Sequence, residues 1–127
     1  MSNPQQVNVG MGETILKRAE LMPDDCAVTF EGKTSTFKEF GDRIRKIASF
    51  LREAGICRGD RVGYIGLNHP CFLETLYACS CLGAIFVPLN FRLTGPEVRF
   101  IANDAGIQML LADDNFVPLI NSEKDNL

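Results

Sequence analysis

The sequence lacks the features that mark several large classes of protein. No apolar run approaches the ~18 residues that a membrane-spanning helix requires. The 13 lysines and arginines are scattered and the formal net charge is -3, so no basic stripe points to nucleic acid. The start of the chain has neither the basic residues nor the apolar core of a secretory signal peptide. We therefore expect a soluble, cytoplasmic protein with no transmembrane segment and no nucleic-acid partner.

Cysteine and histidine form no recognisable chemical motif. The five cysteines are odd in number, lack the spacing of a disulfide framework and include no Cys-x-x-Cys pair for zinc. Cys79 and Cys81 lie two apart on an expected helix, so they point to nearly opposite faces and cannot share a metal. We interpret the cysteines as small apolar side chains in a reducing compartment.

The single histidine, His69, stands at the expected start of a helix, which favours a capping or surface role over that of a general base.

Motifs of nucleotide-binding proteins and of serine hydrolases are also missing. The stretch "GYIGLNHP" (63–70) follows a strand pattern, yet it contains neither the G-x-G-x-x-G fingerprint nor the phosphate loop of the P-loop proteins. Gly63 and Gly66 are placed inside the strand, where glycine permits close approach of a neighbouring element. No G-x-S-x-G nucleophile elbow occurs. The acidic pairs Asp24–Asp25 and Asp113–Asp114 are typical of surface turns. The residues alone therefore indicate no catalytic, cofactor-binding or metal-ligating site.

A long amphipathic helix over 37–54 is the clearest element of the sequence. Thr36 and Glu39 have the spacing of a capping box, in which each side chain satisfies a backbone N–H at the helix start. Apolar residues follow at intervals of three and four, and Gly55 stands where a left-handed helix cap belongs. The basic cluster of this helix is expected on its solvated face and consists of Arg43, Arg45 and Lys46.

The rest of the chain alternates between strand and helix patterns. We expect a helix at 12–22, a hairpin of strands 26–30 and 34–36, a strand at 61–67, a helix at 70–82, a strand at 84–89, a helix between the Thr94–Glu97 capping box and Gly106, a strand at 107–112 and a short helix within 113–120. The helix at 70–82 is apolar on most sides and should be buried on more than one face. The order predicts an α/β fold with a mainly parallel sheet and right-handed crossovers.

Six short segments carry a resemblance to a known family. They are "TFKEF" (36–40), "GICRGDRV" (55–62), "NHPCFLE" (68–74), "LGAIFVPLN" (82–90), "RLTGPEV" (92–98) and "DAGIQMLL" (104–111). In this order and at this spacing they make residues 28–120 resemble the N-terminal part of the adenylate-forming (AMP-binding) enzyme superfamily. Within that superfamily the chain looks most like the AMP-forming acyl-CoA synthetases of long- and medium-chain fatty acids.

The resemblance implies a reaction whose machinery lies elsewhere. In that family a carboxylate attacks the α-phosphate of ATP, pyrophosphate leaves, and the thiol of coenzyme A then displaces AMP, so the parent protein would need ATP, Mg²⁺ and CoA. The catalytic motifs of the family lie downstream of all the matched segments. "FGDR" (40–43) and "RGDR" (58–61) are in the wrong place for the family's ribose-binding pair. The resemblance therefore transfers no catalytic, cofactor-binding or metal residue to this chain.

The chain is thus expected to be the scaffold portion of a ligase and inactive alone. We divide it into a flexible arm (1–12), a partial N-terminal domain (13–120) and a polar tail at a point of truncation (121–127). The missing downstream part of the same polypeptide would be its partner. Without that part, a sheet edge and the helix at 70–82 should lose partners and expose apolar surface, through which copies of the chain could associate.

Three other interpretations remain open at the level of sequence. The chain could belong to another adenylate-forming enzyme, such as an aryl-CoA ligase or a peptide-synthetase adenylation domain. It could be a stand-alone, non-catalytic α/β interaction module. A flavodoxin-like binding domain would require a phosphate-cradling loop after its first strand, and the sequence has none.

Overall fold

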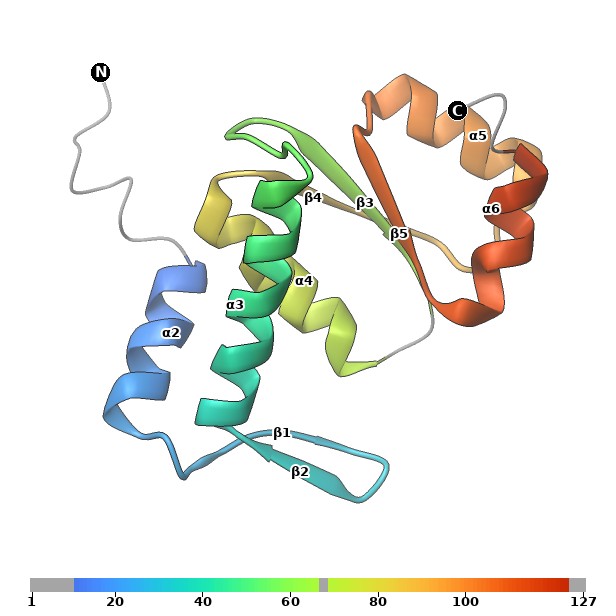
Figure 1. The fold of residues 1–127 in the computed structure, drawn as a ribbon. Coiled ribbons are helices and arrows are strands. Elements are labelled where there is room, and N and C mark those ends of the chain that lie inside the picture. Colours follow the sequence, from blue (N-terminus) through green and yellow to red (C-terminus); the bar gives the residue numbers. More distant parts are fainter. Residues whose placement is uncertain (1–10, 67–68, 124–127) are drawn as a thin grey trace.

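The computed structural model describes residues 11–66 and 69–123 as two layers of helices around a small sheet (Figure 1). In chain order the elements are α2 (Met11–Leu21), β1 (Cys26–Phe30), β2 (Lys33–Thr36), α3 (Phe37–Glu53), β3 (Arg61–Ile65), α4 (Pro70–Leu82), β4 (Ile85–Leu89), α5 (Gly95–Ala105), β5 (Met109–Ala112), the 3-10 turn η1 (Asp114–Phe116) and α6 (Val117–Glu123). The predicted α/β order is confirmed.

The sheet of the described residues has three parallel strands in the order β4-β3-β5. β3 is central, and the chain crosses from β3 to β4 through α4 and back past β3 to β5 through α5. α2, α3 and α4 lie on one face of the sheet, whereas α5 and α6 lie on the other (Figure 1). The β1–β2 hairpin is a separate antiparallel pair at the lower end of α3.

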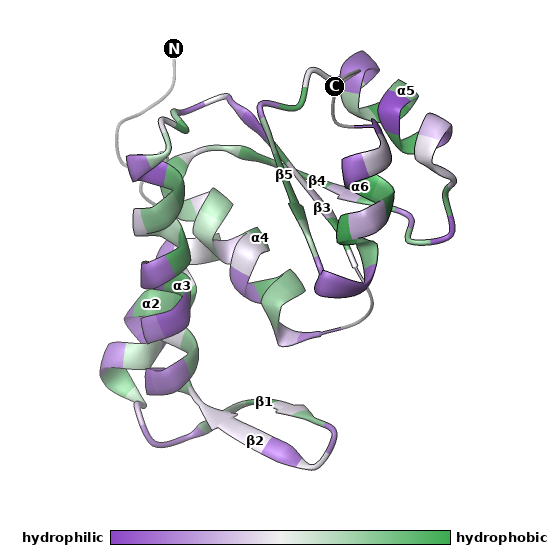
Figure 2. Ribbon diagram, turned by 45° about the vertical axis from the view of Figure 1, so that its right-hand side comes forward, coloured by the Kyte–Doolittle hydropathy of each residue, from purple (hydrophilic) through white to green (hydrophobic). Residues whose placement is uncertain are grey.

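Each face of the sheet has its own hydrophobic cluster. Ile44 and Leu51 of α3, Val62 of β3 and Ala78 of α4 are buried on the first face. Ile65 of β3, Leu89 and Val98 are buried on the second face, with partly buried residues of β5 and α6 around them. The residues of β5 are apolar throughout, as their green colour in Figure 2 shows. A strand with apolar side chains on both sides is the pattern of an interior strand in a parallel sheet.

α4 has two helical partners within this chain, although its Leu73 remains 38% exposed. α2 and α3 both pack against it, and Thr75, Ala78 and Cys79 are fully buried. Gly12 makes the contact with α2 possible, because a Cβ atom there would lie 2.5 Å from the carbonyl oxygen of Tyr77. The prediction that this helix is buried on more than one face is correct, but the sequence does not indicate that α2 packs on one of these faces.

Described helices extend into both terminal segments that the sequence predicts to be an arm and a tail. α2 begins at Met11, inside the segment expected to be an arm, and the Gly12 N–H donates to Ser80 Oγ of α4 at 3.0 Å. α6 continues to Glu123, inside the expected polar tail, and the Glu123 carboxylate lies 3.3 Å from Arg99 Nη1 of α5. The outer residues of both expected segments, 1–10 and 124–127, lie outside the described residues.

Both predicted capping boxes are present. The Thr36 hydroxyl accepts a bond from the Glu39 N–H at 3.2 Å, and the Glu39 carboxylate accepts one from the Thr36 N–H at 3.1 Å. Thr94 and Glu97 repeat the arrangement at the start of α5. The hydrogen bonds from the threonine backbone and then from its hydroxyl lower the pKa values of Glu39 and Glu97 below the ordinary glutamate value.

The capping carboxylates of Glu39 and Glu97 should make the free energy of unfolding depend on pH. A carboxyl whose pKa is lowered on folding stabilises the fold above its unfolded pKa, and this contribution is lost as pH falls through the lowered folded pKa. We expect the double variant Glu39→Gln/Glu97→Gln to lose less thermal stability than the wild type between pH 7 and acid pH, because glutamine caps without titrating. Melting temperatures measured across this range check the result, and Thr36→Ala should flatten the profile in the same direction. Equal acid losses in all three proteins would contradict the assignment.

Candidate functional site

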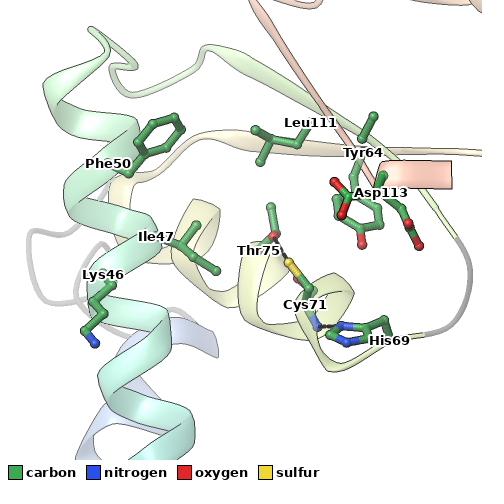
Figure 3. Close-up of a pocket in the computed structure, with 11 residues that line it drawn as sticks. Lys46, Ile47, Phe50, Tyr64, His69, Cys71, Thr75, Leu111 and Asp113 are labelled. Carbon is green, nitrogen blue, oxygen red and sulfur yellow. Dashed lines mark hydrogen bonds between the residues drawn. The ribbon is translucent and has the colours of Figure 1, made fainter. Parts of the chain in front are cut away.

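A cavity lies where the carboxyl ends of β3 and β5 face α3 and the start of α4 (Figure 3). Its volume is ≈ 530 Å³. Its walls are Lys46, Ile47 and Phe50 of α3; His69, Cys71 and Thr75 around the start of α4; and Tyr64, Leu111, Ala112, Asp113 and Asp114 at the strand ends. Figure 3 shows the α3 side chains Lys46, Ile47 and Phe50 on one side of the cavity. Tyr64, His69 and Asp113 lie on the opposite side.

The topology of the sheet explains why the cavity lies there. The chain leaves β3 towards α4 on one face, whereas it leaves the adjacent strand β5 towards α6 on the other face. Connections that diverge from neighbouring parallel strands open a crevice at the carboxyl ends of those strands, which is where ligands of α/β sheets bind. The cavity is therefore in the place where the fold alone predicts a site.

His69 acts as a helix cap, as the sequence predicts. Its Nδ1 accepts a hydrogen bond from the Cys71 N–H at 3.0 Å, and its ring packs edge-on against Phe30 at a centroid distance of 5.3 Å. Since Nδ1 is the acceptor, the neutral ring carries its proton on Nε2. The imidazole satisfies the first turn of α4 and joins this helix to the β1–β2 hairpin.

Tyr64 and Thr75 are buried polar residues that line the cavity, and Tyr64 stands at the end of β3. Burial, and to a smaller extent the nearby Cys71 and Asp113, raise the pKa of its phenol to about 12. The phenol is therefore protonated at neutral pH and can donate a hydrogen bond. Its ring packs against Phe72 and Phe86 at centroid distances of 5.7 and 6.3 Å, which fixes its position on the sheet.

The side chains of the cavity do not suit a polyphosphate. Asp113 and Asp114 place two carboxylates at its rim, and the Asp113 side chain accepts a bond from the Asn115 N–H at 3.1 Å to cap η1. Lys46 is the only permanent cation among the described residues that line it. The residues present therefore do not fit ATP or the nucleotide of CoA, and we derive no chemical step from them. Asp113 and Asp114 lie at the turn after β5, as predicted. Both residues also line this cavity, which was not predicted.

The two glycines of "GYIGLNHP" permit close packing, as predicted. A Cβ atom at Gly63 would lie 2.8 Å from Ile107 Cδ1, and one at Gly66 would lie 2.9 Å from Asp113 Cβ. Their placement is only half right, because β3 ends at Ile65 and Gly66 follows the strand. The predicted strand residue 67 lies outside the described residues.

The ion pair between Arg43 and Glu74 was not predicted from the sequence. Arg43, expected on a solvated face, donates from Nε to the Glu74 carboxylate and from Nη2 to Ser35 Oγ at 2.8 Å. The Glu74 side chain is only 6% exposed, whereas that of Arg43 is 40% exposed. The pair joins the hairpin, α3 and α4. Its signal in the sequence is the single charge of the apolar 70–82 helix, since a carboxylate buried there requires a cation.

The described residues contain neither a metal-ligating cluster nor a membrane-spanning helix. Within 11–66 and 69–123, no three or more histidine, cysteine, aspartate or glutamate side chains are grouped to hold a metal ion. In the same part of the chain, no helix has the length and hydrophobicity needed to cross a membrane.

Comparison with known proteins identifies the family. The family model described as AMP-binding enzyme matches residues 15–126, so the chain belongs to the AMP-binding enzyme family. A feruloyl-CoA synthase of Amycolatopsis sp is 45% identical over 104 residues, which are 82% of this chain and 21% of that protein. The fatty acid–[acyl-carrier-protein] ligase ScoC of Streptomyces coeruleorubidus is 37% identical over 108 residues, 85% of this chain and 21% of that ligase. The chain therefore spans about a fifth of the length of these relatives.

Solved structures give the same result for the fold. A fatty acyl CoA synthetase of Mycobacterium tuberculosis superposes with a TM-score of 0.87 at 27% identity, covering 96% of this chain and 24% of that one. The N-terminal domain of FACL13 from the same organism superposes with a TM-score of 0.85 at 29% identity, covering 91% of this chain and 29% of that one. The predicted fold, the N-terminal part of the acyl-CoA synthetases, is confirmed.

Proposed function

We propose that this chain is the N-terminal scaffold of an AMP-forming acid–CoA ligase and has no ligase activity by itself. The observation that carries the proposal is the match to synthetases over nearly the whole of this chain and only about a quarter of theirs, 96% against 24% for the M. tuberculosis enzyme. The acidic rim of the cavity supports the second half of the proposal, because carboxylates repel the phosphates of ATP and CoA, so the groups that hold these phosphates must come from other residues. In the whole protein, a carboxylate and ATP give an acyl-adenylate and pyrophosphate, and CoA then releases AMP.

The acid is a carboxylic acid of the fatty or the aryl class. The resemblance of the six sequence segments favours a long- or medium-chain fatty acid. A second candidate, an aromatic acid such as ferulate, is favoured by the 45% identity to the Amycolatopsis feruloyl-CoA synthase, compared with 35% to a long-chain-fatty-acid–CoA ligase of Thermus thermophilus.

The first experiment is the intact mass of the natural gene product in its own cells, followed by acid-dependent ATP–pyrophosphate exchange on that protein. We expect a mass several times the 14.1 kDa of this chain, together with exchange activity. A panel of fatty acids and of aryl acids such as ferulate and benzoate then separates the two acid classes. The purified 127-residue chain, at equal molarity and with the same panel, is expected to give no exchange.

A native mass near 14.1 kDa would contradict the proposal. The chain would then be a stand-alone interaction module or one subunit of a split enzyme. Exchange activity in the isolated 127-residue chain would contradict the assignment of a scaffold role just as directly.

A further inference from the structure

One face of the β1–β2 hairpin is turned towards the start of α4. Phe30 is paired with Lys33 and Val28 with Ser35 across the two strands, and side chains paired in this way point to the same face of a sheet. The Phe30 ring packs edge-on against His69 at the start of α4, which identifies this face as the inner one. The Lys33 side chain is therefore carried on the side of the hairpin that faces α4.

A pocket of ≈ 240 Å³ lies between this face of the hairpin and α4. Its polar wall is formed by Lys33 and Ser35 of the hairpin, Arg43 of α3, His69 and the Glu74 carboxylate of α4. Residues from three separate elements thus bring their polar groups to one concave place, which the sequence alone does not indicate.

The polar wall has hydrogen-bond donors that the described residues leave unused. Arg43 donates from Nε to Glu74 and from Nη2 to Ser35, and no bond from its Nη1 is formed within 11–66 and 69–123. Lys33 takes part in none of the four ion pairs of the same residues. Because His69 Nδ1 accepts a bond in the first turn of α4, Nε2 of the neutral ring carries a proton that it can donate.

The charges of this wall leave one positive charge unmatched. Glu74 is the only carboxylate among the described residues that line the pocket, and Arg43 is its partner. The ammonium group of Lys33 has no counter-charge there, so the pocket suits a ligand with a single negative charge. A carboxylate meets this condition and offers two oxygens to the donors, whereas a phosphate group carries close to two negative charges.

The other walls of the pocket are apolar and extend beyond it. Val28, Phe30 and Pro70 line this pocket and also an adjoining pocket of ≈ 390 Å³, to which Phe72 and Leu73 of α4 contribute. We call the two pockets together the hairpin groove. A ligand that covers the apolar part of the groove removes hydrocarbon surface from water, which favours binding. The ligand that suits both parts has one carboxylate and an apolar chain or ring.

We propose that the hairpin groove is a binding site for a carboxylate with an apolar body, whose carboxylate is held by Lys33, Arg43 and His69. The groove itself specifies this chemical class, and the choice of a fatty or an aryl acid within it rests on the proposed function. His69 lines both the groove and the cavity at the strand ends, so its imidazole is the wall between a bound acid and that cavity.

The test is photolabelling of the full-length natural protein with a dodecanoic acid that carries a diazirine at the end of its chain. Mass spectrometry of the digested protein locates the label. We expect label on 28–30 and 69–73, and we expect excess dodecanoate to remove it. No label on either segment overturns the proposal. Competition by dodecanol or by inorganic phosphate as effective as that by dodecanoate also overturns it, because the site would then select for only one part of the ligand.

A pair of lysine variants of the full-length protein provides a second measurement. Lys33→Met removes the unmatched charge and keeps an apolar stem. Lys38→Met is the matched control, since Lys38 is exposed on α3 and pairs with Asp42 outside the groove. We expect Lys33→Met to raise the dodecanoate concentration needed for half-maximal competition at 28–30 and 69–73 roughly fivefold, and Lys38→Met to leave it unchanged. Equal values for Lys33→Met and the wild type overturn the proposal.

The outcomes for the groove and for the ligase function are separable. Label on 28–30 and 69–73 in a protein that shows no acid-dependent ATP–pyrophosphate exchange would overturn only the proposed ligase function. Exchange activity in a protein that takes no label on these segments would overturn only the proposed site.

Discussion

Replacing Arg43 with methionine is expected to lower the free energy of unfolding by roughly 2–3 kcal/mol, because it leaves the buried Glu74 carboxylate without its cation. The value lies below the range for a fully buried pair because 40% of the Arg43 side chain is exposed to solvent. Methionine is unbranched and retains the apolar stem of arginine without its guanidinium group, so the packing between α3 and α4 changes little. Urea unfolding of the wild type and the variant measures the difference.

Arg45→Met is the matched control on the same helix. Arg45 pairs with Asp42 at 3.5 Å, and both side chains are nearly half exposed, so the expected loss is below about 0.5 kcal/mol. The double variant Arg43→Met/Glu74→Met should recover most of the stability, since replacing a buried ion pair with apolar side chains is often neutral. A double variant less stable than Arg43→Met would show that packing, and not the unpaired charge, is responsible.

Leu51→Ala is expected to cost about 3 kcal/mol, within the usual range for a buried leucine. Leu51 is fully buried in the cluster between α3, α4 and the sheet, where its removal leaves a cavity. Its neighbour Phe50 is 55% exposed at the wall of the open cavity, so Phe50→Ala should cost less than about 1 kcal/mol. Both changes introduce alanine into the same turn of α3, so helix propensity affects them alike.

Denaturant unfolding of both variants, with unchanged m-values, checks the prediction. Similar losses in the two variants would mean that α3 is rotated relative to the position described. The pair also separates the core of this chain from the wall of the cavity, because Phe50 lines the cavity and Leu51 does not.

The elements that could be predicted are those whose cause is local. Thr36 with Glu39 and Thr94 with Glu97 act over three residues, and both boxes form. Gly83 and Gly106 end α4 and α5 with φ values of +71° and +68°, which glycine adopts without strain. The capping role of His69 could also be predicted, because the Cys71 N–H that it accepts from is only two residues away.

The features that escaped prediction depend on residues far apart in the chain. Arg43 and Glu74 are 31 residues apart, and Gly12 meets Ser80 across 68 residues. Hydrophobic periodicity gives the face of a helix but not the partner of that face. The cavity was not predicted either, because its walls form only when the strands take the order β4-β3-β5 and α3 packs at its distance from β5. The resemblance supplied the family but no residue of the site.

The position of β5 at the edge of the described sheet also has a consequence for synthesis of the protein on the ribosome. In the longer polypeptide proposed here, α2, α3, α4 and the sheet emerge first and can pack while the uncharged strand β5 is still at the edge of the sheet. At about 5–20 residues per second, each further fifty residues leave this apolar edge uncovered for several seconds. A translational pause after residue 112 would prolong that interval, whereas a chaperone bound to the edge would protect the nascent chain through it.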